Sequence, residues 1–345
     1  MDRKKLTMKR NKHNRLIAVA LLAVALIVSV NMMSCKGKPS TEGLTDEGKI
    51  ETLSRMIDKS PQDAALYFER AEAYVNLEKW NDAIKDLEKA TSLDQKHKEY
   101  YKLLGDTYFR IGDVEHSYKA MEKVVELDEN DVEGYMKLGE IAFYSKDYDR
   151  AMEHLNMVTA KMPDNQAALF MKGFIYKETG DTTNAAFYFR KVIDQHPEYE
   201  PAYEELGFMY ANHGSDLAVE YLNTAISLEP TNTQAMYGLA MYFQDKKRVD
   251  EAEELYKRIT EINPKAEDAW HNLGYIELFH YGDYDNAIEY FNRAIEIDDK
   301  FIEALTNRGW AYAMKGDKTN ARISYNSALA IDPTYQPALE GLGEL

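Results

Sequence analysis

The only cysteine in the chain is the residue whose chemistry stands out first. Cys35 is the single thiol in 345 residues, so an internal disulfide is excluded. An intermolecular bond, a reactive thiol, a buried side chain or a modification site is left open. Cys35 follows Ser34 directly, behind the apolar run Leu16–Val30 and ahead of the polar segment Lys36–Asp46. These flanking segments decide which chemistry to expect.

The segment before Cys35 has the layout of a targeting signal. Seven basic residues precede the apolar run of fifteen residues, which as a helix is ~22 Å long and short of the ~30 Å hydrocarbon core. A basic stretch, a short apolar stretch and a small residue before the cut are typical of a secretory signal. Met8 is an alternative start of this signal.

The arrangement around Cys35 resembles the bacterial lipoprotein signal, with Met32 where that family usually has leucine. The resemblance implies a signal peptide over 1–34 that is removed, a diacylglycerol on the sulfur of Cys35, an acyl chain of the palmitate type on its new amino group, and a lipidated tether over 35–46. Several acyl chains anchor a protein stably, whereas one is marginal. An uncleaved transmembrane anchor and a conventional cleaved signal are the alternatives.

Charge separates the body of the chain from its N-terminus. The whole chain has net charge −17, but residues 1–35 hold seven basic residues and one acidic residue, so the rest carries −23. Such a body repels phosphate backbones and anionic lipid. We therefore expect no nucleic-acid partner, and membrane attachment only through the lipidated cysteine.

No catalytic or metal-binding motif is present. The chain contains no HExxH, P-loop, GxSxG or CxxC sequence, and its histidines, such as His196 and His271, are scattered. The stretches "KDYDRA" and "GDYDNA" resemble calcium loops but lack the required glycine and distal glutamate. We expect no enzyme activity, no cofactor and no metal.

Small residues recur at a fixed period along the rest of the chain. Their spacings are 34, 34, 34, 33, 34, 35 and 34 residues, which places a one-residue deletion near Gly214–Asp216 and an insertion near His280–Gly282, both in turns. Within each period, apolar residues at helical spacing define two helices with a turn between them. The recurring small residues are Ala83, Ser117, Ala151, Ala185, Ala218, Ala252, Ala287 and Ala321.

These residues resemble the tetratricopeptide repeat, a 34-residue helix–turn–helix unit. The resemblance implies an all-α, right-handed superhelical solenoid. We predict an N-terminal capping half-repeat at 47–63 and a short C-terminal cap helix at 336–345, which leaves an apolar face for self-association through the C-terminal repeat. The eight repeats over 64–335 are predicted at 64–97, 98–131, 132–165, 166–199, 200–232, 233–266, 267–301 and 302–335.

In that family the first helices line a concave groove, and the corresponding positions here are rich in aromatic residues and methionine. Such side chains suit peptide recognition, although each could instead pack against the next repeat. The predicted partner-binding residues are Phe68, Lys102, Phe109, Met136, Phe143, Tyr144, Phe170, Phe174, Phe208, Tyr237, Met241, Tyr275, Phe279, Trp310 and Met314.

A clamp for a C-terminal carboxylate is not expected in this groove. Members that bind chaperone tails place basic residues and asparagine in adjacent units. Here Asp106 lies beside Lys102, and Glu133 and Lys137 follow in the next unit. The groove should therefore accept an apolar or basic segment of a protein.

The combined interpretation is a non-catalytic, membrane-anchored scaffold or adaptor for other proteins of the bacterial cell envelope. Lys36 follows the cysteine in place of a retaining aspartate, which favours the outer membrane, on the side facing the periplasm. The alternative is a sensor or regulator whose groove binds a short peptide or glycan, with flexible joints at the deletion and the insertion.

Overall fold

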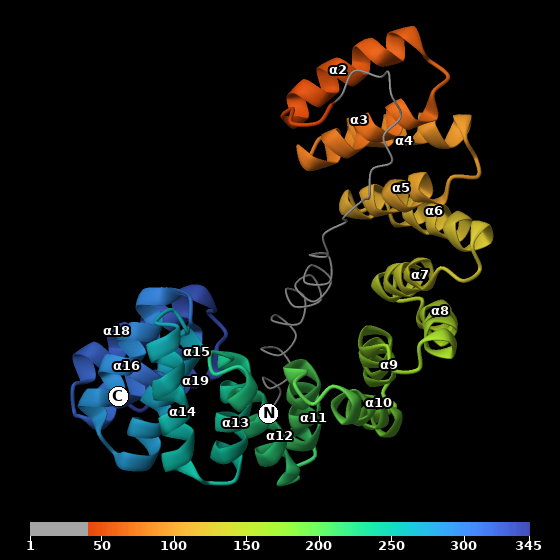
Figure 1. Ribbon diagram of the computed structural model, residues 1–345. Helices are drawn as coiled ribbons and strands as arrows, with labels where there is room; N and C mark the ends of the chain where they lie inside the picture. Colours follow the sequence, from red (N-terminus) through yellow and green to blue (C-terminus); the bar gives the residue numbers. More distant parts are fainter. Residues whose placement is uncertain (1–40) are drawn as a thin grey trace. The chain divides into compact units, whose positions relative to one another are not determined.

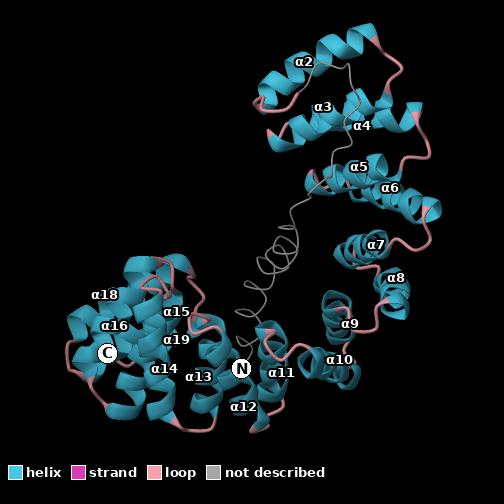
Figure 2. Cartoon of the chain, viewed as in Figure 1, coloured by secondary structure: helices cyan, strands magenta, loops and turns pink. Residues whose placement is uncertain are grey.

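The computed structural model describes residues 41–345, and the regular elements in this part of the chain are all helices, joined by short loops (Figure 2). Cys35, the predicted signal over 1–34 and the start of the tether lie outside the described residues. The all-α helical solenoid expected from the repeat is confirmed for residues 41–345. None of the helices described there is long and apolar enough to cross a bilayer.

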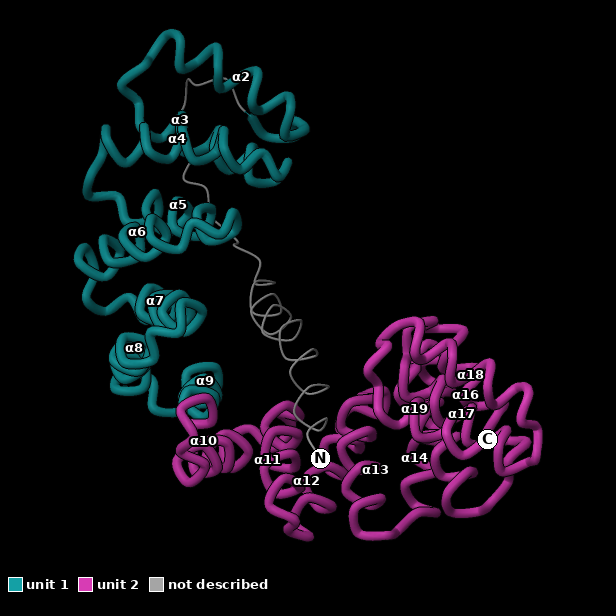
Figure 3. The backbone as a smooth tube through the Cα atoms, turned by 180° about the vertical axis from the view of Figure 1, so that it is seen from behind, with its two compact units in different colours: residues 1–175 teal, residues 176–345 magenta. Residues whose placement is uncertain are grey.

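The chain divides into two compact units that meet within helix α9, and unit 1 ends at Ile175 (Figure 3). In unit 1 a single helix is followed by helix pairs, each pair packed side by side (Figure 1). The helices are α2 (Asp46–Lys59), α3 (Ala64–Asn76), α4 (Trp80–Leu93), α5 (Lys98–Arg110), α6 (Val114–Leu127), α7 (Val132–Tyr144), α8 (Tyr148–Lys161) and α9 (Gln166–Glu178).

Unit 2 comprises residues 176–345. Four helix pairs pack in sequence here, each also against the pair that follows, and a short last helix packs on the final pair. The elements are α10 (Thr182–Gln195), α11 (Glu200–Asn212), α12 (Leu217–Leu228), α13 (Thr233–Asp245), α14 (Val249–Ile262), α15 (Glu267–Ile276), η1 (Glu277–Tyr281), α16 (Tyr284–Ile297), α17 (Ile302–Met314), α18 (Lys318–Ile331) and α19 (Gln336–Gly343).

Aspartates begin most of the second helices. Asp147 accepts a hydrogen bond from the backbone N–H of Arg150 at 3.2 Å, and Asp283 accepts one from Asn286 at 3.1 Å. A side-chain oxygen at this position satisfies an N–H that lacks an intrahelical partner. The first aspartate of "KDYDRA" and the first of "GDYDNA" are therefore helix caps.

Small residues let the two helices of a pair approach closely. Ala83, Ala151 and Ala287 are fully buried at these crossings. At Gly309 the ring of Tyr325 lies so close that an added Cβ would meet it at 2.5 Å. Ser117, which departs from the alanine of the other units, is buried and donates a hydrogen bond to the Gly105 carbonyl at 2.8 Å.

Of the two predicted changes of repeat length, the insertion lies in a helical segment and not in a turn, whereas the deletion lies at the junction of the predicted turn with α12. The extra residue is absorbed by η1, a π-helical segment over Glu277–Tyr281 that continues α15. The missing residue falls where the turn 213–216 passes into α12: α12 has 12 residues against 14 in α10 and α14, and this turn is one residue longer than the turns 179–181 and 246–248. A helix can accept one residue as a π-turn while its flanking turns keep their register, so the helix changed and the left-handed turn residue Gly282 was retained.

Candidate protein-interaction surface

The residues predicted to bind a partner all lie on first helices of the repeats, but they differ in exposure. Tyr144, Tyr275, Phe279 and Met314 are exposed, and Phe170 is buried with 4% of its surface accessible. The others are half-buried: Phe68, Lys102, Phe109, Met136, Phe143, Phe174, Phe208, Tyr237, Met241 and Trp310.

In unit 1 the predicted lysine is held by carboxylates of the same chain. The Lys102 Nζ of α5 lies 2.9 Å from an Asp131 oxygen and 2.8 Å from a Glu133 oxygen. Burial lowers the pKa of Lys102, but the bonds to Glu133 and Asp131 outweigh it, so the pKa is raised overall. Lys102 therefore links α5 to the start of α7, and its positive charge is neutralised by carboxylates of the same chain.

Lys137 makes the reverse link: it lies on α7 and pairs with a carboxylate of α5. Its Nζ lies 3.3 Å from Asp106 of α5 and 3.0 Å from Glu140 of its own helix. It also lies 5.5 Å from the ring centre of Phe109, whose ring makes an edge contact with Tyr144 at 5.7 Å. Both lysines that could have formed a carboxylate clamp are therefore already paired with carboxylates.

Other predicted side chains of unit 1 belong largely to the packing. Met136 and Phe143 lie against the core formed by Ala142, Leu155 and neighbouring residues. Phe68 contacts the Tyr100 ring at 4.8 Å. The Phe170 ring contacts Phe174 edge to face at 5.0 Å.

In unit 2 four predicted residues gather on α15, η1 and α17, and we call them the ring cluster: Tyr275, Phe279, Trp310 and Met314. The Tyr275 and Phe279 ring centres are 4.6 Å apart, and Phe279 meets Trp310 edge to face at 5.7 Å. Trp310 also packs against the core around Phe291, while Phe279 is 49% and Met314 64% exposed. The cluster is a surface of accessible rings on a rigid base.

The predicted residues that precede the ring cluster in unit 2 are tied into the scaffold. The ring of Phe208 lies directly against Gly238, where an added Cβ would clash with it. The Tyr237 hydroxyl accepts a hydrogen bond from Asn272 at 3.0 Å, and burial raises the pKa of Tyr237. Like Phe208 and Tyr237, Met241 packs against the core of unit 2 that contains Tyr256.

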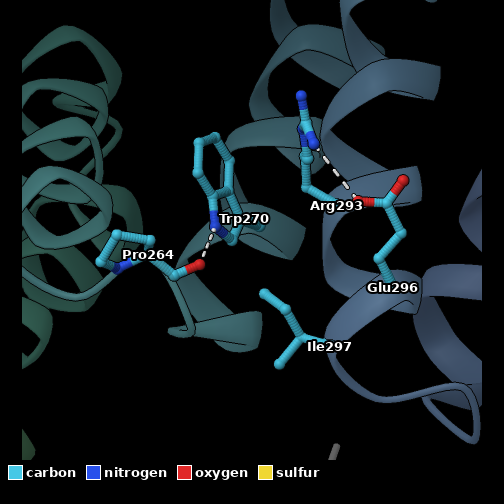
Figure 4. Close-up of a pocket in the computed structure, with 5 residues that line it drawn as sticks. All are labelled: Pro264, Trp270, Arg293, Glu296 and Ile297. Atoms are coloured by element: carbon cyan, nitrogen blue, oxygen red, sulfur yellow. Dashed lines mark hydrogen bonds and ion pairs between the residues drawn. The ribbon is translucent and has the colours of Figure 1, made fainter.

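The close-up in Figure 4 shows a shallow pocket of about 310 Å³ that the sequence did not indicate. Trp270 donates its indole N–H to the Pro264 carbonyl at 3.0 Å, and Ile297 and the Arg293–Glu296 ion pair complete the lining. In the sequence, this pocket could have been predicted from the proline that recurs six residues before an aromatic residue. Because Trp270 is hydrogen-bonded to Pro264, we interpret the pocket as a product of the packing between these residues and not as a binding site.

The described residues 41–345 contain no cluster of metal-binding side chains. No group of three or more His, Asp or Glu side chains in this part could hold a metal ion. His271 lies 2.9 Å from the Asn307 amide nitrogen, within a contact between α15 and α17.

Comparison with known proteins places this helical repeat array in a class. Four family models described as tetratricopeptide repeat match residues 68–132, 167–199, 215–273 and 266–334, together more than half of the chain. The chain belongs to the tetratricopeptide repeat family.

Known structures and a curated relative are similar in fold and repeat. The C-terminal part of a TPR repeat-containing protein from Cytophaga hutchinsonii has a TM-score of 0.61 at 19% identity, covering 71% of this chain and 99% of that one. A tetratricopeptide repeat protein from Parabacteroides merdae has a TM-score of 0.51 at 15% identity, covering 72% and 98%.

Anaphase-promoting complex subunit 7 of Dictyostelium discoideum is 28% identical over 120 residues, or 35% of this chain. The match spans only 20% of that relative's length. The likeness therefore concerns the repeat. At the level of its repeat family, the chain is a protein-interaction scaffold, because helical repeat arrays of this family present extended surfaces to other proteins.

Proposed function

We propose that this protein is a lipid-anchored, non-catalytic scaffold of the bacterial cell envelope, attached to the outer membrane through Cys35 and facing the periplasm. One observation carries the interaction part of the proposal. Exposed aromatic and methionine side chains gather on first helices, while the core is already filled by other residues. Such rings offer a large contact area at low entropic cost.

Site-directed photo-crosslinking in cells tests the interaction part. A photoreactive residue replaces Phe279, and the same residue at Phe187 is the matched control, because Phe187 is 52% exposed on α10. We expect one dominant adduct with an envelope protein from position 279 and none from position 187. Adducts that are the same from both positions, or absent from both, would overturn the scaffold.

The attachment is tested by Cys35→Ser in the full chain. The proposal expects incorporation of labelled palmitate and recovery in the membrane fraction for the unaltered chain, and loss of both for Cys35→Ser. Palmitate labelling that persists in the variant would contradict the role of Cys35. Fractionation of inner and outer membranes then tests the outer-membrane assignment.

One observation favours the sensor alternative: the π-helical segment η1 lies at the repeat insertion. It carries Phe279 of the ring cluster, and π-segments occur frequently at functional sites. A peptide or glycan that changes the radius of gyration in solution scattering would support a sensor, whereas an unchanged radius with a constitutive partner supports the scaffold.

Self-association through the C-terminal repeat predicts a dimer in sedimentation, and a strict monomer would rule it out.

A further inference from the structure

We propose that Glu277 makes the π-helical segment η1 a pH-sensitive hinge, which is closed against α14 when the Glu277 carboxyl group is protonated and loosened when it is ionised. The inference is carried by the kind of residue at this position and by the groups that surround it. The hinge itself is independent of the proposed scaffold function, and only its effect on a partner, through Phe279 of η1, rests on that function.

Glu277 occupies a position that a backbone hydrogen bond marks in every repeat. Its carbonyl oxygen accepts the N–H of Asp283, six residues later, at 2.9 Å. In the next repeat the carbonyl of Tyr312 accepts the N–H of Asp317, five residues later, at 2.8 Å. The extra residue in the first case is the insertion that forms η1. The residues whose carbonyls make this bond in the other repeats are Tyr74, Tyr108, Ala142, Tyr176, Tyr210, Phe243 and Tyr312.

The side chain at this position is aromatic in six of those repeats and alanine in one, whereas here it is a carboxylate. Glu277 is only 8% exposed. Its carboxyl group forms neither a hydrogen bond nor an ion pair with any residue in the range 41–345. A buried charge without a partner is costly. The repeat that contains the insertion is therefore also the repeat with an unpaired buried acid at this position.

The groups around Glu277 do not neutralise it. Glu253 of α14 and Asp283 before α16 repel its charge, and Lys257 of α14, which attracts it, is already bonded to Glu253 at 2.6 Å. The Tyr290 hydroxyl of α16 also faces this group, and burial raises the pKa of Tyr290, so the hydroxyl stays neutral. Burial, together with the repulsion from Glu253 and Asp283, raises the pKa of Glu277.

The bond that holds η1 to α14 ends in the same group of carboxylates. The Tyr281 hydroxyl of η1 donates to Asp250 at 2.7 Å and lies 3.3 Å from a Glu253 oxygen. His280 of η1 is exposed and contacts the Tyr281 ring edge to face. Repulsion between Glu277 and Glu253 therefore acts across the contact that closes η1 on α14.

The direction of the response follows from the raised pKa of Glu277. A carboxyl group with a raised pKa in the closed state binds its proton more tightly there than in an open state. The closed form of η1 is therefore most stable below the ordinary carboxyl pKa of 4.5, and it loses stability as the pH rises through the raised value. Above that value η1 opens more often, and Phe279 moves with it.

Hydrogen–deuterium exchange of the full chain, read by mass spectrometry and corrected for the intrinsic exchange rate, tests the hinge. Protection of the segment 277–283 should be about fivefold higher at about pH 5 than at about pH 7.5. The segment 312–317 is the control within the same chain, because Tyr312 takes the place of the acid there. Its protection should not change over this range.

Variants assign the response to one group. Glu277→Gln should raise the protection of 277–283 at about pH 7.5 to its value at about pH 5 and remove the pH dependence. Glu277→Tyr, which restores the residue of most other repeats, should have the same effect. Glu289→Gln, at an exposed acid of α16, is the matched control and should leave the dependence unchanged.

Two results would overturn the proposal. A pH dependence that persists in Glu277→Gln would belong to His280 or to another group, since histidine also titrates in this range. An equal dependence in 277–283 and 312–317 of the unaltered chain would mean that the whole repeat array responds. If the hinge responds as proposed but crosslinking from position 279 yields no partner, the scaffold function alone fails. If crosslinking yields a partner but protection does not vary with pH, the hinge is wrong and the scaffold stands.

Discussion

Neighbouring repeats are joined by different chemistry within unit 1 and in the later part of unit 2, whereas Lys177 and Glu205 at the start of unit 2 form an ion pair. In unit 1 the first helices are linked by charges, with Lys98 and Lys102 of α5 both bonded to Asp131 at the start of α7. In unit 2 the corresponding links between α13 and α15 and between α15 and α17 are amide contacts, Asn272 to Tyr237 and Asn307 to His271.

A pair of arginines at equivalent places shows the same contrast. Arg70 of α3 and Arg308 of α17 each reach a residue sixteen positions later. In unit 1 this partner is the carboxylate of Asp86, bound at 2.6 and 2.7 Å, and in unit 2 it is the hydroxyl of Ser324. Burial, with no carboxylate beside it, lowers the pKa of Arg308.

The difference shows that one backbone repeat tolerates ionic or neutral links between its helices. Where the links are ionic, the first-helix lysines are neutralised by the chain itself and have little charge to offer a partner. Where they are neutral, exposed rings such as Tyr275 and Phe279 remain on the first-helix side. Four substitutions test this comparison.

The largest effect is expected for Asp131→Ala in unit 1. Asp131 caps α7 through the Gly134 N–H at 2.8 Å, and its 4% exposed side chain also binds two lysines. Loss of the cap and of the ion pairs should lower the free energy of unfolding by about 3 kcal/mol in urea denaturation. Hydrogen exchange should localise the loss to α5 and α7.

Asp131→Asn is the control, because it keeps a capping oxygen and removes the charge; it should lose less than Asp131→Ala. The two lysines lower the pKa of Asp131 against the cost of burial. A lowered carboxyl pKa means that the ionic part is present above about pH 4 and is lost as the pH falls below that. Equal stability of Asp131→Asn and the unaltered chain would show that the ion pairs contribute nothing.

Gly309→Ala in unit 2 should cost about 2 kcal/mol. The new Cβ meets the Tyr325 ring at 2.5 Å, and a rigid ring in a packed core must shift to make room. In unit 1 Gly105→Ala meets the flexible end of Met121 at 2.8 Å, so thermal unfolding should show a much smaller change. Equal losses would mean that the rings of unit 2 do not make its crossings tighter.

Ser324→Asp should convert the neutral link of unit 2 into the ionic one of unit 1. Giving Arg308 a carboxylate partner should raise the free energy of unfolding by about 1 kcal/mol, because hydrogen bonds to charged groups exceed neutral ones. Ser324→Asn controls for size and should not stabilise. A loss of stability in Ser324→Asp alone would show that this crossing cannot accept a second charge.

Glu277→Gln is expected to have the smallest effect, a rise in Tm of about 1 °C at neutral pH. Burial raises the pKa of Glu277, and Glu253 and Asp283 add to it, while Lys257 opposes. A raised carboxyl pKa means that the folded state binds more protons, so stability falls as the pH rises above the ordinary value near 4.5. The gain in Tm should therefore disappear below that pH; a gain that persists in acid would assign it to another cause.

Much of the fold followed from residues in the sequence. The buried alanines at the 34-residue period, such as Ala151 and Ala287, mark the helix crossings because only small side chains fit there. The ring cluster was also within the predicted set, since Tyr275 and Trp310 occupy equivalent positions of neighbouring repeats.

Other features of the site needed the three-dimensional structure. Phe170 has the same repeat position as other predicted residues, yet it is buried, because exposure depends on what the neighbouring repeat places beside it. The pairing of Lys102 with Asp131 and Glu133 joins residues 29 and 31 positions apart. No periodicity within one helix specifies such a pair.

The sequence by itself determined the class of protein, its helix pairs and the kind of side chain on each first helix, because helical periodicity and small-residue spacing are local properties. Tertiary structure alone decided that one extra residue became a π-segment in η1. It also decided that the unit 1 lysines are neutralised by their own chain and that Phe279 and Met314 remain exposed. These outcomes depend on packing between repeats, where side chains distant in sequence compete for the same space and the same partners.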